Sequence, residues 1–263
     1  MGVAAVRPVS TRPSGVPTEV TGIHTRILRV TLGLEEARSY WEHVDPSVPV
    51  VSRSGRAFEE RWFGGKSLER VRFLISTFGE RFDPFPGTLD ALRHLVGADP
   101  VTRQIVCHFH VQLSDPIYRG FTGRFLVKRR GLRSPTVDRD AALRWVRDEF
   151  PGRWSAATEV QFASKLLSAA SEAGLVTAKR DPRTVVLPKV TDMALTYLLY
   201  SLRGIRFEGT LLENPYFASL GLTEGFLEQR LRAVPGVAFR RMGDLLDFEW
   251  AYASLAAWAE ATL

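Results

Sequence analysis

The sequence of 263 residues has very few of the side chains that build disulfides and metal sites. Its one cysteine, Cys107, cannot form an internal disulfide, which favours a reducing, cytoplasmic environment. Its five histidines are scattered, except in the segment CHFH, where His108 and His110 follow Cys107. Side chains at positions i, i+1 and i+3 of a helix do not converge on one ion, and no second Cys/His pair has zinc-finger spacing. We therefore expect no metal site.

Enzyme motifs and long hydrophobic runs are also missing. The segment FGGKS at 63–67 lacks the spacing of a P-loop. The sequence has neither a G-x-S-x-G motif nor a dinucleotide-binding glycine fingerprint. The longest apolar run, near MALTYLLY at 193–200, is far shorter than the roughly 18 to 20 residues of a membrane span. We expect a monomeric cytoplasmic protein that catalyses no reaction, binds no cofactor and contacts no membrane.

The first 133 residues divide into a tail and a helical region. Residues 1–18 are rich in Pro, Ser and Arg, which predicts a flexible tail and not a signal peptide. Prolines break the segment 45–55, VDPSVPVVSRS. Apolar spacing and Asp-Pro caps predict the helices of a region spanning 19–133. They are expected over 34–44, over 68–82 after the N-cap Ser67, over 88–96, and from Pro100 and Pro116 onwards.

Positive charge is present in excess, and its position is informative. The net charge is +6, and 30 of the 35 basic residues are arginine, a ratio that a GC-rich genome explains. The segment IYRGFTGRFLVKRRGLR at 117–133 contains no acidic residue. The helix dipole accounts for one or two basic residues at a helix end, whereas six without a counter-charge favour contact with phosphates. These six are Arg119, Arg124, Lys128, Arg129, Arg130 and Arg133.

The segment FPGRWSAATEVQFASKLLSAASEAGLV at 150–176 predicts the second half of a helix-turn-helix. A helix over 138–149 leads through the turn PGRW into a helix over 156–173, with Ser155 as N-cap and Gly174 as its end. The segment 175–187 then predicts a hairpin that turns at Asp181-Pro182. This is the element order of a winged helix, and we assign it to a module spanning 134–204. Its expected buried stripe is Val160, Ala163, Leu166, Leu167 and Ala170.

The opposite face of the 156–173 helix carries short or flexible hydrogen-bonding side chains. A face of this kind can approach a DNA groove closely, where carboxylates would be repelled by phosphate. It can equally be a solvated face, and many winged helices bind protein. The candidate DNA-binding residues of this module are Arg153, Ser155, Thr158, Gln161, Lys165, Lys179, Arg180 and Arg183.

A second module over 205–263 repeats the order of helix, hairpin and helix. The segment VAFRRMGDLLDFEW alternates like two strands around Gly243-Asp244, and an amphipathic helix follows. Glu224 and Glu228 make this module less basic, which favours a structural or protein-binding role. The predicted fold is therefore mainly α, with a helical N-terminal region followed by two winged-helix or helix-turn-helix modules with short β-hairpins.

Several of these stretches together resemble the BrxA family, the small helical component of BREX bacteriophage-exclusion systems. They are GGKSLERVRFLISTFGERF, WSAATEVQFASKLLSAASEAGLV, VVLPKVTDMALTYLLY, NPYFASLGLTEGFLEQRLRAV and FEWAYASLAAWAEA. The resemblance spans about residues 25–260 and departs from the family in the Pro-rich tail and in segment 45–55. It implies a helical fold, binding of double-stranded DNA, no catalytic residues, and service beside a methyltransferase and ATPases.

Two hypotheses follow. The protein is a non-enzymatic DNA-binding component of a phage-defence system, or it is a protein-interaction scaffold within such a complex with little DNA contact. A positive surface that joins 124–133, the 155–165 face and the 179–183 tip favours DNA binding. An exposed apolar patch on 222–262 favours the scaffold.

Overall fold

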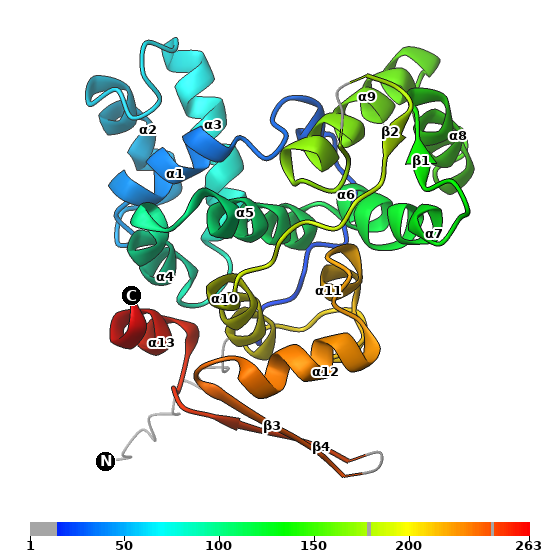
Figure 1. The fold of residues 1–263 in the computed structure, drawn as a ribbon. Helices are drawn as coiled ribbons and strands as arrows, with labels where there is room; N and C mark the ends of the chain where they lie inside the picture. The colour runs from blue at the N-terminus through cyan, green and yellow to red at the C-terminus, as the bar shows by residue number, and fades with distance from the viewer. Residues whose placement is uncertain (1–14, 178–179, 243–244) are drawn as a thin grey trace, which may run out of the picture.

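The computed structural model describes residues 15–177, 180–242 and 245–263. Helices dominate the described chain, and they are joined by two small antiparallel sheets of two strands each (Figure 1). The expected mainly α class is therefore confirmed. The buried apolar side chains form one cluster that extends from the N-terminal helices to the C-terminal helix.

The N-terminal region forms the helices that the apolar spacing predicts, together with one that it does not. Ser67 caps α3 by accepting from the Arg70 amide at 3.3 Å. A helix, α2, occupies most of the segment that we expected to be broken. It forms because Arg53 is buried and donates to Val48 O and to a carboxylate oxygen of Asp83, the residue that follows α3. The elements are η1 (Arg26–Leu28), α1 (Leu34–His43), α2 (Val50–Glu59), α3 (Leu68–Phe82), α4 (Thr88–His94) and η2 (Leu95–Gly97).

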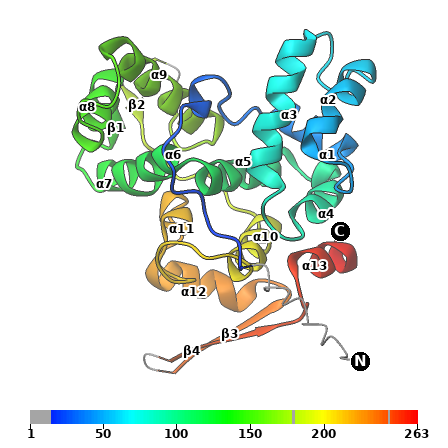
Figure 2. The same ribbon diagram turned by 180° about the vertical axis from the view of Figure 1, so that it is seen from behind.

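Helix α5 (Pro100–Ser114) runs through the middle of the molecule and is buried along most of its length (Figures 1 and 2). The Asp-Pro caps occur as expected: the Asp99 carboxylate accepts from the Thr102 amide, and the Asp115 carboxylate accepts from two amides of the next helix. The chain continues through α6 (Pro116–Gly120), the π-helical turn η3 (Phe121–Phe125) and α7 (Leu126–Arg130).

The segment expected to form a helix-turn-helix consists of α8 (Arg139–Glu149) and α9 (Ala156–Glu172). Gly174 ends α9 with a φ of +71°, a conformation that favours glycine. The chain then returns antiparallel as predicted, because the Thr177 amide donates to Thr184 O and the Val186 amide donates to Leu175 O. The sequence did not reveal a further pairing, in which β2 (Arg183–Thr184) lies beside β1 (Thr136–Val137), the segment that precedes α8.

The C-terminal part contains the predicted hairpin, β3 (Val237–Met242) with β4 (Leu245–Trp250). The hairpin extends beside α12 (Glu224–Ala233), away from the rest of the molecule (Figure 1). The last helix, α13 (Leu255–Thr262), returns to pack against α4 and α10 (Asp192–Arg203). Residues 205–263 therefore share their core with the N-terminal helices. The short helix α11 (Pro215–Ser219) packs on η3.

Candidate nucleic-acid interface

Helices α8 and α9 are held together by aromatic rings in the turn between them. The Trp154 ring lies 4.4 Å from that of Phe162 and 5.3 Å from that of Phe150, centroid to centroid. The Arg147 guanidinium donates to the Glu159 carboxylate at 2.9 Å, which links the two helices a second time. Ser155 caps α9 as predicted and accepts from the Thr158 amide at 3.3 Å. The start of α9 is thereby fixed against α8.

The exposed face of α9 differs from the prediction in one position. Gln161 and Lys165 are exposed and Thr158 is half-buried, so all three remain on the outer face. Val160, which we expected in the core, is 39% exposed, and Phe162 is fully buried in its place. The larger ring buries more apolar area than the valine side chain, and this sets the rotation of the helix.

Both carboxylates of α9 are held by intramolecular partners. Glu159 is buried against Arg147. Glu172, at the other end of the helix, accepts from the Thr31 hydroxyl at 2.6 Å and from the Leu32 amide at 2.9 Å. The outward face of α9 therefore presents hydroxyl, amide and ammonium groups without an acid among them.

The tip that follows α9, at 179–183, contributes fewer exposed cations than the sequence predicted. The Arg183 side chain is only 11% exposed, because its guanidinium donates to the Asp181 carboxylate at 3.0 Å and to Leu167 O at 2.9 Å. Arg183 thus anchors the 180–184 segment to α9. Arg180 is exposed, as is Arg153 in the turn before α9. Lys179 lies outside the described residues.

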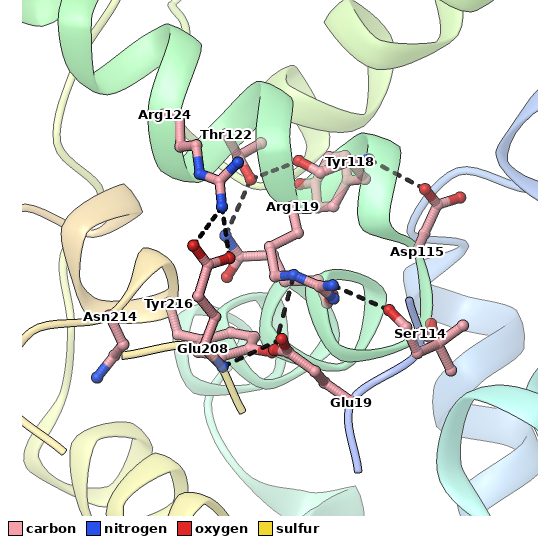
Figure 3. Close-up of polar contacts among 12 residues, drawn as sticks. Glu19, Ser114, Asp115, Tyr118, Arg119, Thr122, Arg124, Glu208, Asn214 and Tyr216 are labelled. Carbon is pink, nitrogen blue, oxygen red and sulfur yellow. Dashed lines mark hydrogen bonds and ion pairs between the residues drawn. The ribbon is translucent and has the colours of Figure 1, made fainter. Parts of the chain in front are cut away.

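The basic run at 117–133 is mostly committed to internal contacts, so our expectation of six uncompensated cations was wrong. Figure 3 shows the first two of these residues. Arg119 is 7% exposed; its guanidinium donates to Gln112 O and Val20 O and lies 3.7 Å from the Glu19 carboxylate. Arg124 forms an ion pair with Glu208. Both acids come from segments remote in the sequence, which is why the local absence of acids misled the prediction.

Of the other four residues of the run, two are held by internal contacts and two are exposed. Arg129 donates to Thr136 O at 2.9 Å, and Arg130 donates to Ser219 O at 2.7 Å; burial lowers the pKa of Arg130. Lys128 and Arg133 are exposed, and within the described part of the chain neither has a carboxylate partner. Because Arg129 ties α7 to β1, these two free cations lie near the strand that pairs with the tip segment.

The C-terminal hairpin and α12 expose apolar side chains. Met242 is 66% exposed, Phe226 is 53% exposed, and Leu246 is also exposed. Arg241 pairs with Glu228, and Arg240 lies 3.5 Å from Glu249. The charges of this region are thus largely balanced, in agreement with its expected weaker basic character.

The CHFH segment contributes to the core through hydrogen bonds. His108 bonds to the Tyr118 hydroxyl at 2.8 Å and to the Ser219 hydroxyl at 2.9 Å, while His110 bonds to the Tyr197 hydroxyl at 2.6 Å. Burial lowers the pKa of both histidines to about 3. Burial also raises the pKa of Cys107 to about 12. Within the described ranges, no group of three or more His, Cys, Asp or Glu side chains is placed to hold a metal ion.

None of the helices described here has the length and apolarity needed to cross a membrane. In comparisons with protein-family models and with curated proteins, no match to this sequence was found.

Proposed function

We propose that this protein binds double-stranded DNA without catalysing a reaction, and that α8 and α9 form a winged helix-turn-helix with α9 as the recognition helix. The observation that carries the proposal is the outer face of α9, where Thr158, Gln161 and Lys165 are accessible and both glutamates are held elsewhere. In helix-turn-helix proteins, the N-terminal residues of the recognition helix contact base edges in the major groove. Gln161 is suited to adenine, which an amide recognises through two hydrogen bonds.

The phosphate contacts of this proposal come from exposed cations around α9. Arg153 precedes the helix, and Arg180 lies in the segment that serves as the wing. Lys128 and Arg133 extend the basic surface on the side of β1. The proposed surface leaves out the arginines that have intramolecular partners: Arg119, Arg124, Arg129, Arg130 and Arg183. The surface is smaller than the sequence predicted and is centred on α9.

We further propose a role in a BREX-type defence against bacteriophages, beside a methyltransferase and ATPases. This part rests on the resemblance of the quoted stretches to the BrxA family. The resemblance implies a helical fold, and the described chain is mainly helical.

Fluorescence anisotropy with a duplex of about 25 base pairs, at several salt concentrations, tests DNA binding. If about five phosphates are contacted, log K should fall against log salt with a slope near −4.5. The variant Lys128→Glu/Arg133→Glu should weaken binding to all duplex sequences alike, because phosphate contacts carry no base information. A matched control is Arg72→Glu/Arg232→Glu, which reverses two exposed arginines on α3 and α12. Equal affinities of the two variants would contradict the proposed surface.

The scaffold hypothesis is favoured by a separate observation, the exposed Phe226, Met242 and Leu246 on the C-terminal part. Exposed apolar side chains of this size occur at protein-protein contacts. Met242 and Leu246 lie on opposite faces of the hairpin, because their cross-strand partners are Leu245 and Arg241. If the scaffold function holds, Met242→Gln/Leu246→Gln should abolish co-purification with the methyltransferase or an ATPase and leave duplex affinity unchanged.

A further inference from the structure

A groove of about 410 Å³ lies where α9 faces α3 and the start of α1. Figure 2 shows the chain segment before α1 passing between α3 and α9. The hydrogen bonds from Thr31 and Leu32 to Glu172 hold this segment against the C-terminal end of α9. The groove volume lies in the usual range of ligand sites, roughly 300 to 1,000 Å³.

Three cations from three separate elements line this groove: Arg29, Arg70 and Lys165. Within the residues that the structure describes, none of them has a carboxylate partner. The Arg29 guanidinium lies 3.8 Å from the centre of the Phe73 ring, a cation-π contact that orients it. Arg70 donates to Arg29 O at 3.4 Å. The two arginines are therefore held side by side.

The carboxylates that line the groove are occupied by other donors. Glu172 is hydrogen bonded to Thr31, Leu32 and Gly33. Glu36 lies 3.3 Å from Lys66, and Glu35 lies 3.8 Å from Arg38. Glu35 and Glu36 thus have cationic partners, whereas Glu172 is held by neutral donors and keeps its charge. Among the described residues, the three groove cations have no ion-pair partner, so the lining keeps an excess of two positive charges. The groove is consequently arranged for an anion with more than one charge.

The position of Lys165 indicates which anion the groove binds. Lys165 belongs both to the groove and to the outer face of α9, one helical turn after Gln161. We propose that the groove holds the phosphodiester backbone of the duplex that α9 contacts, with Arg29, Arg70 and Lys165 as its phosphate contacts. This inference rests on the proposed DNA binding and adds α3 and the segment before α1 to the interface.

The test compares Arg29→Ala/Arg70→Ala with wild type in anisotropy titrations on a duplex of about 25 base pairs. Loss of two phosphate contacts should reduce the salt slope by about 1.8, so the fall in affinity between about 50 and 200 mM salt becomes about 12-fold smaller. The charge-retaining variant Arg29→Lys/Arg70→Lys should keep the wild-type slope. Arg72→Ala, on the same helix as Arg70 and outside the groove lining, is the matched control and should also keep it.

The outcomes separate the groove from the DNA-binding proposal itself. If wild type binds duplex and Thr158→Ala/Gln161→Ala weakens it, but Arg29→Ala/Arg70→Ala keeps the wild-type slope, the groove inference is overturned and the proposed function stands. If wild type binds no duplex, both are overturned. Binding of inorganic tripolyphosphate that depends on Arg29 and Arg70, with duplex binding unchanged, would assign the groove to a free polyphosphate and refute the DNA backbone as its occupant. Circular dichroism and thermal unfolding confirm that each variant is folded.

Discussion

Replacing Arg119 by alanine tests whether the basic run is structural or binds DNA. The Arg119 guanidinium is buried between the N-terminal segment and α5, where it donates to Gln112 O at 2.7 Å and to Val20 O at 2.9 Å (Figure 3). The Glu19 carboxylate, 3.7 Å away, is itself buried; it also accepts from the Tyr216 hydroxyl and the Glu208 amide. The arginine therefore joins the N-terminal segment to α5, and Glu19 extends the contact to residues 208–216.

The expected loss is large because the substitution leaves a buried carboxylate without its cation. Breaking a buried ion pair by removing one partner costs about 3 to 5 kcal/mol of unfolding free energy, against a total of roughly 5 to 15 kcal/mol for a folded domain. The matched control is Arg124→Ala in the same run. Its pair with Glu208 is more than half exposed on both sides, so its loss should cost less than about 1 kcal/mol.

Urea denaturation followed by circular dichroism measures both variants, and Glu19→Gln supplies a second test. Alone, Glu19→Gln should destabilise the protein, because Arg119 loses its counter-charge. Combined with Arg119→Ala, the same change should restore stability, because the stranded carboxylate is removed. Equal, small losses for Arg119→Ala and Arg124→Ala would refute the structural role of Arg119. If the folded Arg119→Ala protein binds DNA with a reduced salt slope, Arg119 contacts a DNA phosphate and belongs to the interface.

Three further predictions concern the core. Phe162→Ala should lower the free energy of unfolding, measured by urea denaturation, by about 3 to 5 kcal/mol. Val160→Ala should change it little. A larger loss for Val160→Ala than for Phe162→Ala would contradict the observed rotation of α9. Because the pKa of His108 and of His110 is lowered to about 3, the unfolded chain binds more protons than the folded chain below pH about 6.5. The melting temperature should therefore fall as pH is lowered through that value. His110→Gln should weaken this dependence of the melting temperature on pH, whereas His94→Gln, a change of an exposed histidine, should not. Cys107, buried and with its pKa raised to about 12, should react with a thiol reagent only after guanidinium unfolding; labelling of the native protein at pH about 8 would contradict its burial.

Local signals in the sequence determined most of the helical framework. Ser67, Asp99 and Ser155 cap helices where predicted, since the bond from a side-chain oxygen to an amide three residues later involves only neighbouring residues. Gly174 ends α9 for an equally local reason, its positive φ. The β3–β4 hairpin was also predicted, because strand alternation around a Gly-Asp turn involves only neighbouring residues.

The tertiary structure alone decided which charges are free. Helix α2 forms around the buried Arg53, whose partner Asp83 lies at the end of α3, and no local pattern indicates this pairing. Glu19 and Glu208 come from segments far from the basic run and bind Arg119 and Arg124. The groove cations Arg29, Arg70 and Lys165 meet only after the chain folds. Ion pairing acts through space over a few ångströms, so the sequence determined the sum of charges, and the fold determined which of them face solvent.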